Sequence, residues 1–496
     1  MRHVAGLALL LLAAPANAAP EPPIEESALR QHIAYLADDA LEGRKPGTEG
    51  GNKAAFYVAQ QLQRAGLRPG APGGGWYQPV PLTERIPLSA TQSWQGAGGA
   101  FTLSPGSFQF TARNERIALD KVDVIFAGYG REHPEKSFAD LKGIDVRGKV
   151  VLLLSGKPKG VDDVPGLEVR RQAIARAGAR AVLALTGAND PWDLIHDQLE
   201  QGRTTLTDDI HAPLEGAIAF PAWNALLKAG GVDSAKLAAA AAQPGFRAVS
   251  LNLSADIAAQ SRLRSYVSVN VIAKLAGESR PEEAVLYLAH WDHLGLCRPA
   301  GVRDRICNGA VDNASGIAVM IEAARRLADG PRPQRSIYFV ATTAEEMGLY
   351  GARVLAARPP VPRDRIAGAL NLDTVAIAPA GEAVAVIGRG RTRLDPVIDR
   401  AVLAQGREID PDEAANAFIT RQDGWELLKV GIPTVMLGGG FSDPVRLATF
   451  LAGDYHKPSD DLDRAIPLDG AAEDGALYVA LGRMMADPTE LSLPDR

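Results

Sequence analysis

Apolar residues follow two patterns along the chain. From about Tyr266 onward, short continuous apolar runs alternate with stretches in which apolar residues recur every three to four positions. Such runs are typical of strands buried on both faces, and the second spacing is typical of amphipathic helices. The expected strands cover 268–273, 284–289, 336–341, 366–372, 383–387 and 432–437, and the expected helices cover 314–328, 349–357, 393–405 and 471–485. This alternation predicts an α/β fold with a mixed, largely parallel central sheet and helices on both faces.

The segment before residue 89 has a similar helical pattern. Helices are expected over 25–41 and 52–66, and the Gly-rich segment 41–51 between them is expected to be a structural turn without phosphate-binding character. Residues 77–82 are extended in pattern, but Pro79 and Pro81 would confine them to a sheet edge.

The middle of the chain has a different character. Between residues 89 and 262 several short strands are expected, and the histidines His133, His196 and His211 are isolated from carboxylate partners of ligand-like spacing. We therefore predict a discontinuous catalytic domain over 24–88 and 263–490. A β-rich α+β domain without catalytic residues would be inserted over 89–262.

The N-terminal residues 1–18 have the features of a secretory signal peptide. Arg2 precedes an apolar stretch from Val4 to Ala14, and Ala16-Asn17-Ala18 fits a cleavage site. A buried helix is the alternative, but Pro15 and Pro20 disfavour it. We expect a periplasmic or secreted protein that has no membrane association after cleavage. The net charge of −6 argues against nucleic acid as a partner.

Ionisable residues follow the expected strands at the points where those strands end. These residues are His290, Asp292, Asp312, Glu345, Glu346, Asp373 and His456. Ligands of parallel sheets bind beyond the carboxyl ends of the strands, so these side chains should meet at one edge. Histidine and carboxylate side chains are zinc ligands.

Two histidines and three carboxylates suffice for two Zn²⁺ ions that share one carboxylate. The candidate ligands are His290, Asp312, Glu346, Asp373 and His456. Glu345 is then free to act as a general base on a metal-bound water. Asp292 could accept the second N–H of the His290 imidazole. His293 is expected to be a wall or hydrogen-bonding residue and not a ligand.

The two cysteines of the chain, Cys297 and Cys307, are ten residues apart in the same expected loop. In an oxidising compartment this spacing favours a disulfide. A pair of zinc thiolates is the alternative.

At the candidate metal ligands and Glu345, the sequence resembles the co-catalytic dizinc exopeptidases of the bacterial leucyl aminopeptidase type, peptidase family M28. The matching segments are ALEGRKPGTEGG, AHWDHLG, GAVDNASG, ATTAEEMGLYGA, LNLDTV and DYHKPSDD. The resemblance implies that His290 and Asp373 hold one zinc, Glu346 and His456 hold the other, and Asp312 bridges them.

The resemblance also implies an activity. It would be zinc-dependent hydrolysis of the N-terminal bond of peptide substrates, with Glu345 deprotonating a metal-bridging water and Tyr455 hydrogen-bonding the developing oxyanion. The insert is similar to the protease-associated domain that many members carry.

One segment departs from the family. Members often have Arg-Ser-Asp-His where this chain has Arg421-Gln-Asp-Gly424, followed by Trp425. Arg421 and Asp423 are retained, and Arg421, Asp423 and Trp425 are expected to contact or surround the substrate. The preferred N-terminal residue stays open for this reason.

Three other functions remain possible on the same scaffold. A single-zinc glutaminyl cyclase would be consistent with Trp291 and Trp425 near the site. A carboxypeptidase acting on acidic dipeptides would need a basic pocket. A non-enzymatic binding protein would usually have lost ligands, whereas all the candidate ligands are present here.

Overall fold

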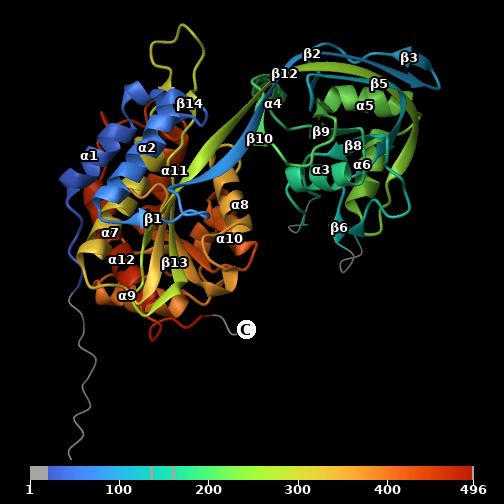
Figure 1. The fold of residues 1–496 in the computed structure, drawn as a ribbon. Coiled ribbons are helices and arrows are strands. Elements are labelled where there is room, and N and C mark those ends of the chain that lie inside the picture. Colours follow the sequence, from blue (N-terminus) through green and yellow to red (C-terminus); the bar gives the residue numbers. More distant parts are fainter. Residues whose placement is uncertain (1–19, 134–137, 159–160, 162–163, 494–496) are drawn as a thin grey trace, which may run out of the picture. The chain divides into compact units, whose positions relative to one another are not determined.

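The structure is a computed structural model that describes residues 20–133, 138–158, 161 and 164–493 (Figure 1). The expected signal peptide, residues 1–18, lies outside the described residues. Within the described part of the chain, no helix has the length and apolar character that crossing a membrane requires.

The chain forms two compact units. One contains the residues up to Val80 and those from Val267 onward, and the other contains Pro81–Tyr266. The expected boundaries were 88/89 and 262/263. Both observed boundaries fall inside long strands, β2 (Tyr77–Gly96) and β12 (Val249–Leu275), so no change of pattern marks them in the sequence.

The sheet of the first unit is mixed with a parallel centre, which confirms the predicted fold class. Its strand order is β18-β19-β17-β13-β16-β12. The bounds are β13 Arg280–His290, β16 Arg335–Thr342, β17 Ile366–Asn371, β18 Ala385–Ile387 and β19 Thr434–Gly438. Strands β19, β17, β13 and β16 run parallel, and β18 and β12 pair antiparallel at the two sides.

Helices cover both faces of this sheet (Figure 1). On one side Val285, Tyr287 and Ala289 of β13 pack in a core with residues of six helices. These are α1 Glu26–Leu36, α2 Glu49–Arg64, α7 Gly316–Asp329, α9 Asp395–Ala404, α11 Pro444–Gly453 and α12 Leu468–Ala486. On the other side Leu286 and Leu288 pack with residues of α8 (Tyr350–Ala357) and α10 (Gly424–Leu428). Burial of both faces explains why β13 is apolar without alternation.

The second unit has its own sheet and its own core. Strands β5, β8, β9 and β11 run parallel, and β4 is antiparallel to β11. The bounds are β4 Phe108–Ala112, β5 Arg116–Phe126, β8 Val150–Leu154, β9 Ala181–Leu185, β10 Arg203–Leu206 and β11 Leu214–Ile218. The helices are α3 Leu167–Arg176, α4 Trp192–Glu200, α5 Phe220–Ala229 and α6 Ser234–Ala242.

Antiparallel pairs of β2 with β10 and of β12 with β5 add to these strands, which agrees with the β-rich α+β domain expected from the sequence. The continuous apolar runs Val150–Leu154 and Ala181–Leu185 form strands that are buried on both faces. In β8, Val150 and Leu152 face one core cluster and Val151 and Leu153 face another.

Candidate metal centre

Ionisable side chains gather beyond the carboxyl ends of the parallel strands of the first unit. His290 is the last residue of β13 and pairs in register with Thr342, the last residue of β16. Glu345 and Glu346 follow β16, and Asp373 follows β17. His456 comes after α11 (Pro444–Gly453). The structure therefore brings the side chains selected from the sequence to one edge of the sheet.

Asp312 lies between the two histidines. Its Oδ1 atom is 3.2 Å from Nε2 of His290, and its Oδ2 atom is 3.3 Å from Nε2 of His456. His290 Nε2 is also 3.5 Å from Oδ1 of Asp373, and His456 Nε2 is 3.0 Å from Oε2 of Glu346. Two groups of three donors thus share one carboxylate. The peptide bond from Asp312 to Asn313 is cis.

These distances between donor atoms fit the tetrahedral coordination of zinc. Ligand atoms about 2.0–2.1 Å from a tetrahedral zinc lie roughly 3.3 Å from one another. The four donor–donor distances of 3.0 to 3.5 Å agree with that spacing. In addition, the buried Nε2 atom of His456 has no hydrogen-bond partner among the described residues. The donor set is therefore suited to a metal ion on each side of Asp312.

The carboxylate of Asp292 does not have the predicted contact with the imidazole of His290. The main-chain carbonyl of Asp292 lies 3.1 Å from Nδ1 of His290, which leaves Nε2 available to a metal. The Asp292 carboxylate instead accepts the backbone N–H of Glu345 at 3.2 Å. The chain turns directly after β13, so the carbonyl faces the imidazole and the side chain reaches the next loop. Burial raises the pKa of Asp292 to about 7, although His290 opposes the rise.

Glu345 lines a cavity of about 40 Å³ together with His290, Asp312 and Asp373. Burial raises the pKa of the Glu345 carboxyl well above its usual range; His290 opposes this rise, and the nearby carboxylates of Glu346 and Asp373 add to it. Oxygen and nitrogen atoms of Glu345, His290 and Asp373 lie within 4.8 Å of one another. Proximity alone therefore does not distinguish a base from a ligand at this position.

The remainder of the cavity wall is mainly apolar. It includes Phe418, Met436, Phe441, Leu447 and Leu451. The polar residues of this wall are Thr374, Arg421, Gln422 and Tyr455. The ring of Tyr455 stacks on that of His456 with centroids 3.7 Å apart. Burial raises the pKa of Tyr455 and the neighbouring carboxylates raise it further, so its hydroxyl keeps a proton to donate.

Arg421 lines the cavity, but Asp423 and Trp425 are not among the cavity-lining residues. Asp423 is buried, and its carboxylate accepts a hydrogen bond from the hydroxyl of Thr342. Trp425 packs against an apolar cluster that includes Ile419 and Met436, and Met436 also lines the cavity. Trp425 therefore belongs to the packing around the cavity wall and not to the residues that line the cavity.

Arg44 is a residue that the sequence interpretation missed. The predicted structural turn between α1 and α2 places its fully buried guanidinium against the main-chain carbonyls of Trp291 at 2.8 Å, Gly309 at 2.7 Å and Asp312 at 3.3 Å. It also donates to the carbonyl of Asn308. Burial lowers the pKa of Arg44 to about 10, which still leaves it charged near neutral pH. The motif ALEGRKPGTEGG was the available signal, since it contains Arg44.

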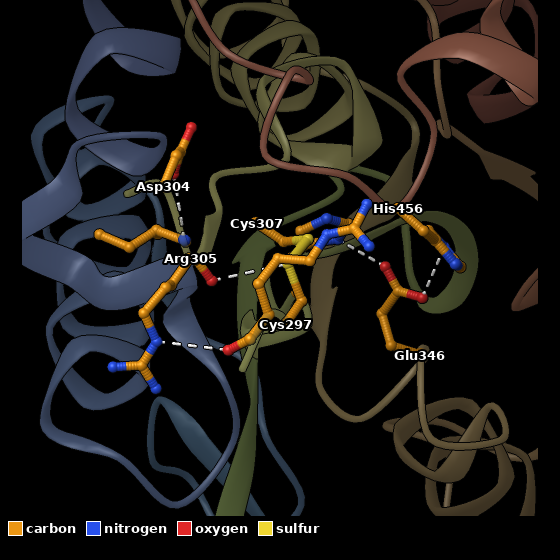
Figure 2. The surroundings of a disulfide bond; sticks show 9 residues. Cys297, Asp304, Arg305, Cys307, Glu346 and His456 are labelled. Atoms are coloured by element: carbon orange, nitrogen blue, oxygen red, sulfur yellow. Dashed lines mark hydrogen bonds and ion pairs between the residues drawn. A yellow bond between two sulfur atoms is a disulfide. The ribbon is translucent and has the colours of Figure 1, made fainter. Parts of the chain in front are cut away.

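His293 lies beside the ligands, as a hydrogen-bonding residue. Its Nδ1 atom is 2.5 Å from Oε1 of Glu346, while Oε2 of the same carboxylate is directed to His456. Figure 2 labels Glu346 and His456 and draws both interactions of this carboxylate. The position of Glu346 is thereby fixed from two sides.

The predicted disulfide between Cys297 and Cys307 is confirmed (Figure 2). It closes a hairpin of two short strands, β14 (Gly295–Leu296) and β15 (Ile306–Cys307). The hairpin packs against the loop that contains Arg44. At Gly43, which has a φ of 67°, a Cβ atom would lie 2.5 Å from the carbonyl oxygen of Cys307, so only glycine permits this approach.

Comparison with curated proteins finds partial matches. A probable zinc metalloprotease of Leptosphaeria maculans is 38% identical over 108 residues, which are 21% of this chain and 24% of that protein. A probable glutamate carboxypeptidase of Arabidopsis thaliana, LAMP1, is 31% identical over 180 residues, which are 35% of this chain and 23% of that protein. The match thus spans about a quarter of the length of these relatives.

The fold is similar to that of a solved structure over nearly the whole chain. The aminopeptidase from Aneurinibacillus sp. strain AM-1 superposes with a TM-score of 0.57 at 18% identity, covering 96% of this chain and 97% of that one. Residues 270–480 match the family model described as Peptidase family M28. The candidate metal centre, with its five candidate ligands and Glu345, therefore lies entirely within a segment that is similar to that peptidase family.

Proposed function

We propose that this chain is a zinc-dependent aminopeptidase that removes N-terminal residues from peptides. The observation that carries the proposal is the position of Asp312, whose two carboxylate oxygens each face a different histidine, His290 and His456. A carboxylate shared in this way is the arrangement that two metal ions need in order to act on one substrate.

Two zinc ions held by His290, Asp312, Glu346, Asp373 and His456 would polarise the scissile carbonyl and lower the pKa of a water molecule between them. Glu345 accepts the proton of the attacking water and returns it to the leaving amine. The hydroxyl of Tyr455 donates a hydrogen bond to the oxygen on which negative charge develops.

The cavity wall indicates a substrate class. Phe418, Met436, Phe441, Leu447 and Leu451 form an apolar surface next to the catalytic groups. We infer that this surface accommodates an apolar side chain of the N-terminal residue, because burying such a side chain there releases water from both surfaces.

We also propose that the protein is periplasmic or secreted after loss of residues 1–18, and that the unit Pro81–Tyr266 is a protease-associated domain. Support for export comes from the N-terminal pattern and from the disulfide between Cys297 and Cys307. Support for the second proposal comes from the position of the unit as an insertion between the two parts of the catalytic unit.

The test combines metal analysis with kinetics. Purified protein should contain two zinc ions per chain and should hydrolyse leucyl-4-nitroanilide. Chelation should abolish this activity and added zinc should restore it. A protein with fewer than one bound metal per chain and with unchanged hydrolysis after chelation would rule out the proposal.

A carboxypeptidase is the second candidate, and Arg421 is the observation that favours it. A cationic side chain in the cavity wall can pair with a substrate carboxylate. N-acetylation of a peptide separates the two functions, because it blocks an aminopeptidase and leaves a carboxypeptidase active. Trp291 and Trp425, on which the glutaminyl cyclase alternative was based, are not among the residues that line the cavity.

A further inference from the structure

The unit Pro81–Tyr266 contains a cavity of about 60 Å³ with arginines in its wall. Arg85 comes from β2, Arg113 follows β4, Arg171 comes from α3, and Arg203 begins β10. Strands β2 and β10 pair in register at Arg85 and Arg203, which places these two residues side by side. The cavity is remote in sequence from the catalytic residues and lies within this unit alone.

Arg171 is buried, but not all N–H groups of its guanidinium have a hydrogen-bond partner among the described residues. It is 7% exposed, and Nη2 of its guanidinium donates a hydrogen bond to the carbonyl of Gly216 at 2.9 Å. Its Nε atom has no hydrogen-bond partner among the described residues. Burial lowers the pKa of Arg171, and Glu215 and Glu168 oppose that decrease. A buried cation normally has its donors occupied by acceptors.

Two further buried polar atoms in the wall of this cavity lack a hydrogen-bond partner among the described residues. Nη1 of Arg113 and Nε2 of His211 are buried, and neither atom has a partner in the described part of the chain. Together with Nε of Arg171 they supply three polar atoms from three separate segments, which are α3, the loop after β4 and the loop between β10 and β11. Such convergence on one cavity is typical of a site built to receive a ligand.

The lining of the cavity is mostly cationic. Among the described residues that line it, four are arginines and one, Glu215, is a carboxylate. Glu168 pairs with Arg203 at 2.7 Å, and Glu215 lies 3.2 Å from Nδ1 of His211. The unpartnered Nε of Arg171 and Nη1 of Arg113 are donors of charged guanidinium groups, so an anion is the ligand that matches them.

We propose that this cavity binds a small organic carboxylate. A guanidinium presents paired N–H donors that match the two oxygens of a carboxylate. A water molecule needs roughly 10–15 Å³ of such space, so the cavity has room for about four to six non-hydrogen atoms. Ala112, Leu199 and Ala212 supply apolar wall for a short aliphatic stem, and the negative charge of Glu215 disfavours a dianion such as phosphate.

The proposal is tested by calorimetric titration of the full-length protein with sodium butyrate at constant ionic strength. We expect saturable binding in the millimolar range, and at least a tenfold loss of affinity in Arg171→Met. The matched control is Arg176→Met, because Arg176 lies on the same helix and is exposed. This control should bind as the wild type does. The readout needs no peptidase activity, so it is independent of the function proposed above.

Zinc also binds carboxylates, so binding by itself does not locate the site. The dependence on Arg171 does, and Arg113→Met supplies a second variant whose substitution removes a less buried side chain, in case Arg171→Met does not fold. Butyrate affinity that is unchanged in both variants would overturn the proposal. So would Arg171-dependent binding of inorganic phosphate without binding of butyrate, since the ligand class would then be wrong.

Discussion

The carboxylate of Asp460 holds the backbone of Asp312 in place. Its Oδ2 atom accepts the N–H of Asp312 at 3.0 Å, and its Oδ1 atom accepts the N–H of Val311 at 2.9 Å. Asp460 is buried and lies four residues after His456 in the chain. The loop that supplies one histidine therefore also positions the carboxylate that is shared with the other histidine.

We predict that Asp460→Asn weakens zinc binding without removing any ligand. An amide side chain has one acceptor oxygen. One of the backbone N–H groups of Val311 and Asp312 would therefore face an NH₂ group. Leaving one such donor unsatisfied costs about 1–3 kcal/mol. We expect zinc affinity to fall roughly 10- to 100-fold, which competition with a chelator would measure.

Asp461→Asn is the control for that experiment, because within the described part of the chain the Asp461 carboxylate accepts a hydrogen bond only from the N–H of the adjacent Leu462. Equal zinc affinities in the two variants would mean that the contact between Asp460 and Asp312 has no role in the metal centre.

Glu345 and Glu346 are adjacent but should respond differently to the same substitution. Glu345→Gln should lower kcat by roughly 10²- to 10⁴-fold, because the general base is lost, while the zinc content stays at the wild-type value. Glu346→Gln should lose zinc, because Glu346 is a proposed ligand whose Oε2 atom lies 3.0 Å from Nε2 of His456. Elemental analysis with steady-state kinetics measures both. Equal loss of zinc in the two variants would make Glu345 a ligand and not a base.

The sequence was sufficient to select side chains that the structure brings together, but not the residues that position them. His290 and Asp373 could be predicted because they directly follow apolar strands, and the carboxyl ends of parallel strands share an edge. The role of Arg44 depends on a main-chain path that brings residues 291, 308, 309 and 312 around one guanidinium. No local pattern encodes such a path.

The failed expectations have a similar cause. Asp292 contacts His290 through its carbonyl, and Trp425 is not among the residues that line the cavity. Both outcomes depend on the direction that the main chain takes over one or two residues. Hydrophobic periodicity carries no information at that scale.

Arg44→Met should destabilise the catalytic unit and lower its zinc affinity. The substitution keeps the apolar volume but removes the guanidinium donor from the carbonyls of Trp291 and Asp312. The carbonyl of Gly309 loses the same donor but keeps the N–H of Ala314 at 3.2 Å. The expected loss is about 3 kcal/mol or more, because more than one buried acceptor loses its charged donor. Thermal unfolding of metal-free and zinc-loaded protein measures both effects. Arg30→Met, at an exposed position of α1, should show neither effect.

Glu322 should contribute stability that depends on pH. This residue of α7 lies 3.3 Å from Nε2 of His32 on α1, and it accepts hydrogen bonds from Arg325 at 2.8 and 2.9 Å. Burial alone would raise the pKa of Glu322, but the hydrogen bonds with His32 and Arg325 outweigh burial and lower the pKa to about 2. An unfolded glutamate has a pKa of about 4.3.

A lowered pKa means that the folded protein binds the proton less tightly than the unfolded chain. The stabilisation is therefore complete above about pH 4.3 and is lost as the pH falls towards 2. Glu322→Gln should cost about 2–3 kcal/mol at pH 7, and the difference from wild type should shrink below pH 4.3. Urea unfolding of metal-free protein at several pH values measures this. A difference that stays constant with pH would show that the charge of Glu322 has no stabilising role.

Removal of the disulfide should affect catalysis while the metal is retained. Cys297 and Cys307 close the hairpin that packs on Gly43, next to Arg44, and none of the five candidate zinc ligands lies within that hairpin. In Cys297→Ser/Cys307→Ser the hairpin loses a constraint worth about 2–3 kcal/mol. We expect a several-fold decrease in kcat/KM and an unchanged zinc content, because the ligands keep their own contacts. Kinetics identical to those of the wild type would show that the bridge has no functional role, and loss of zinc would show that the hairpin supports the ligands directly.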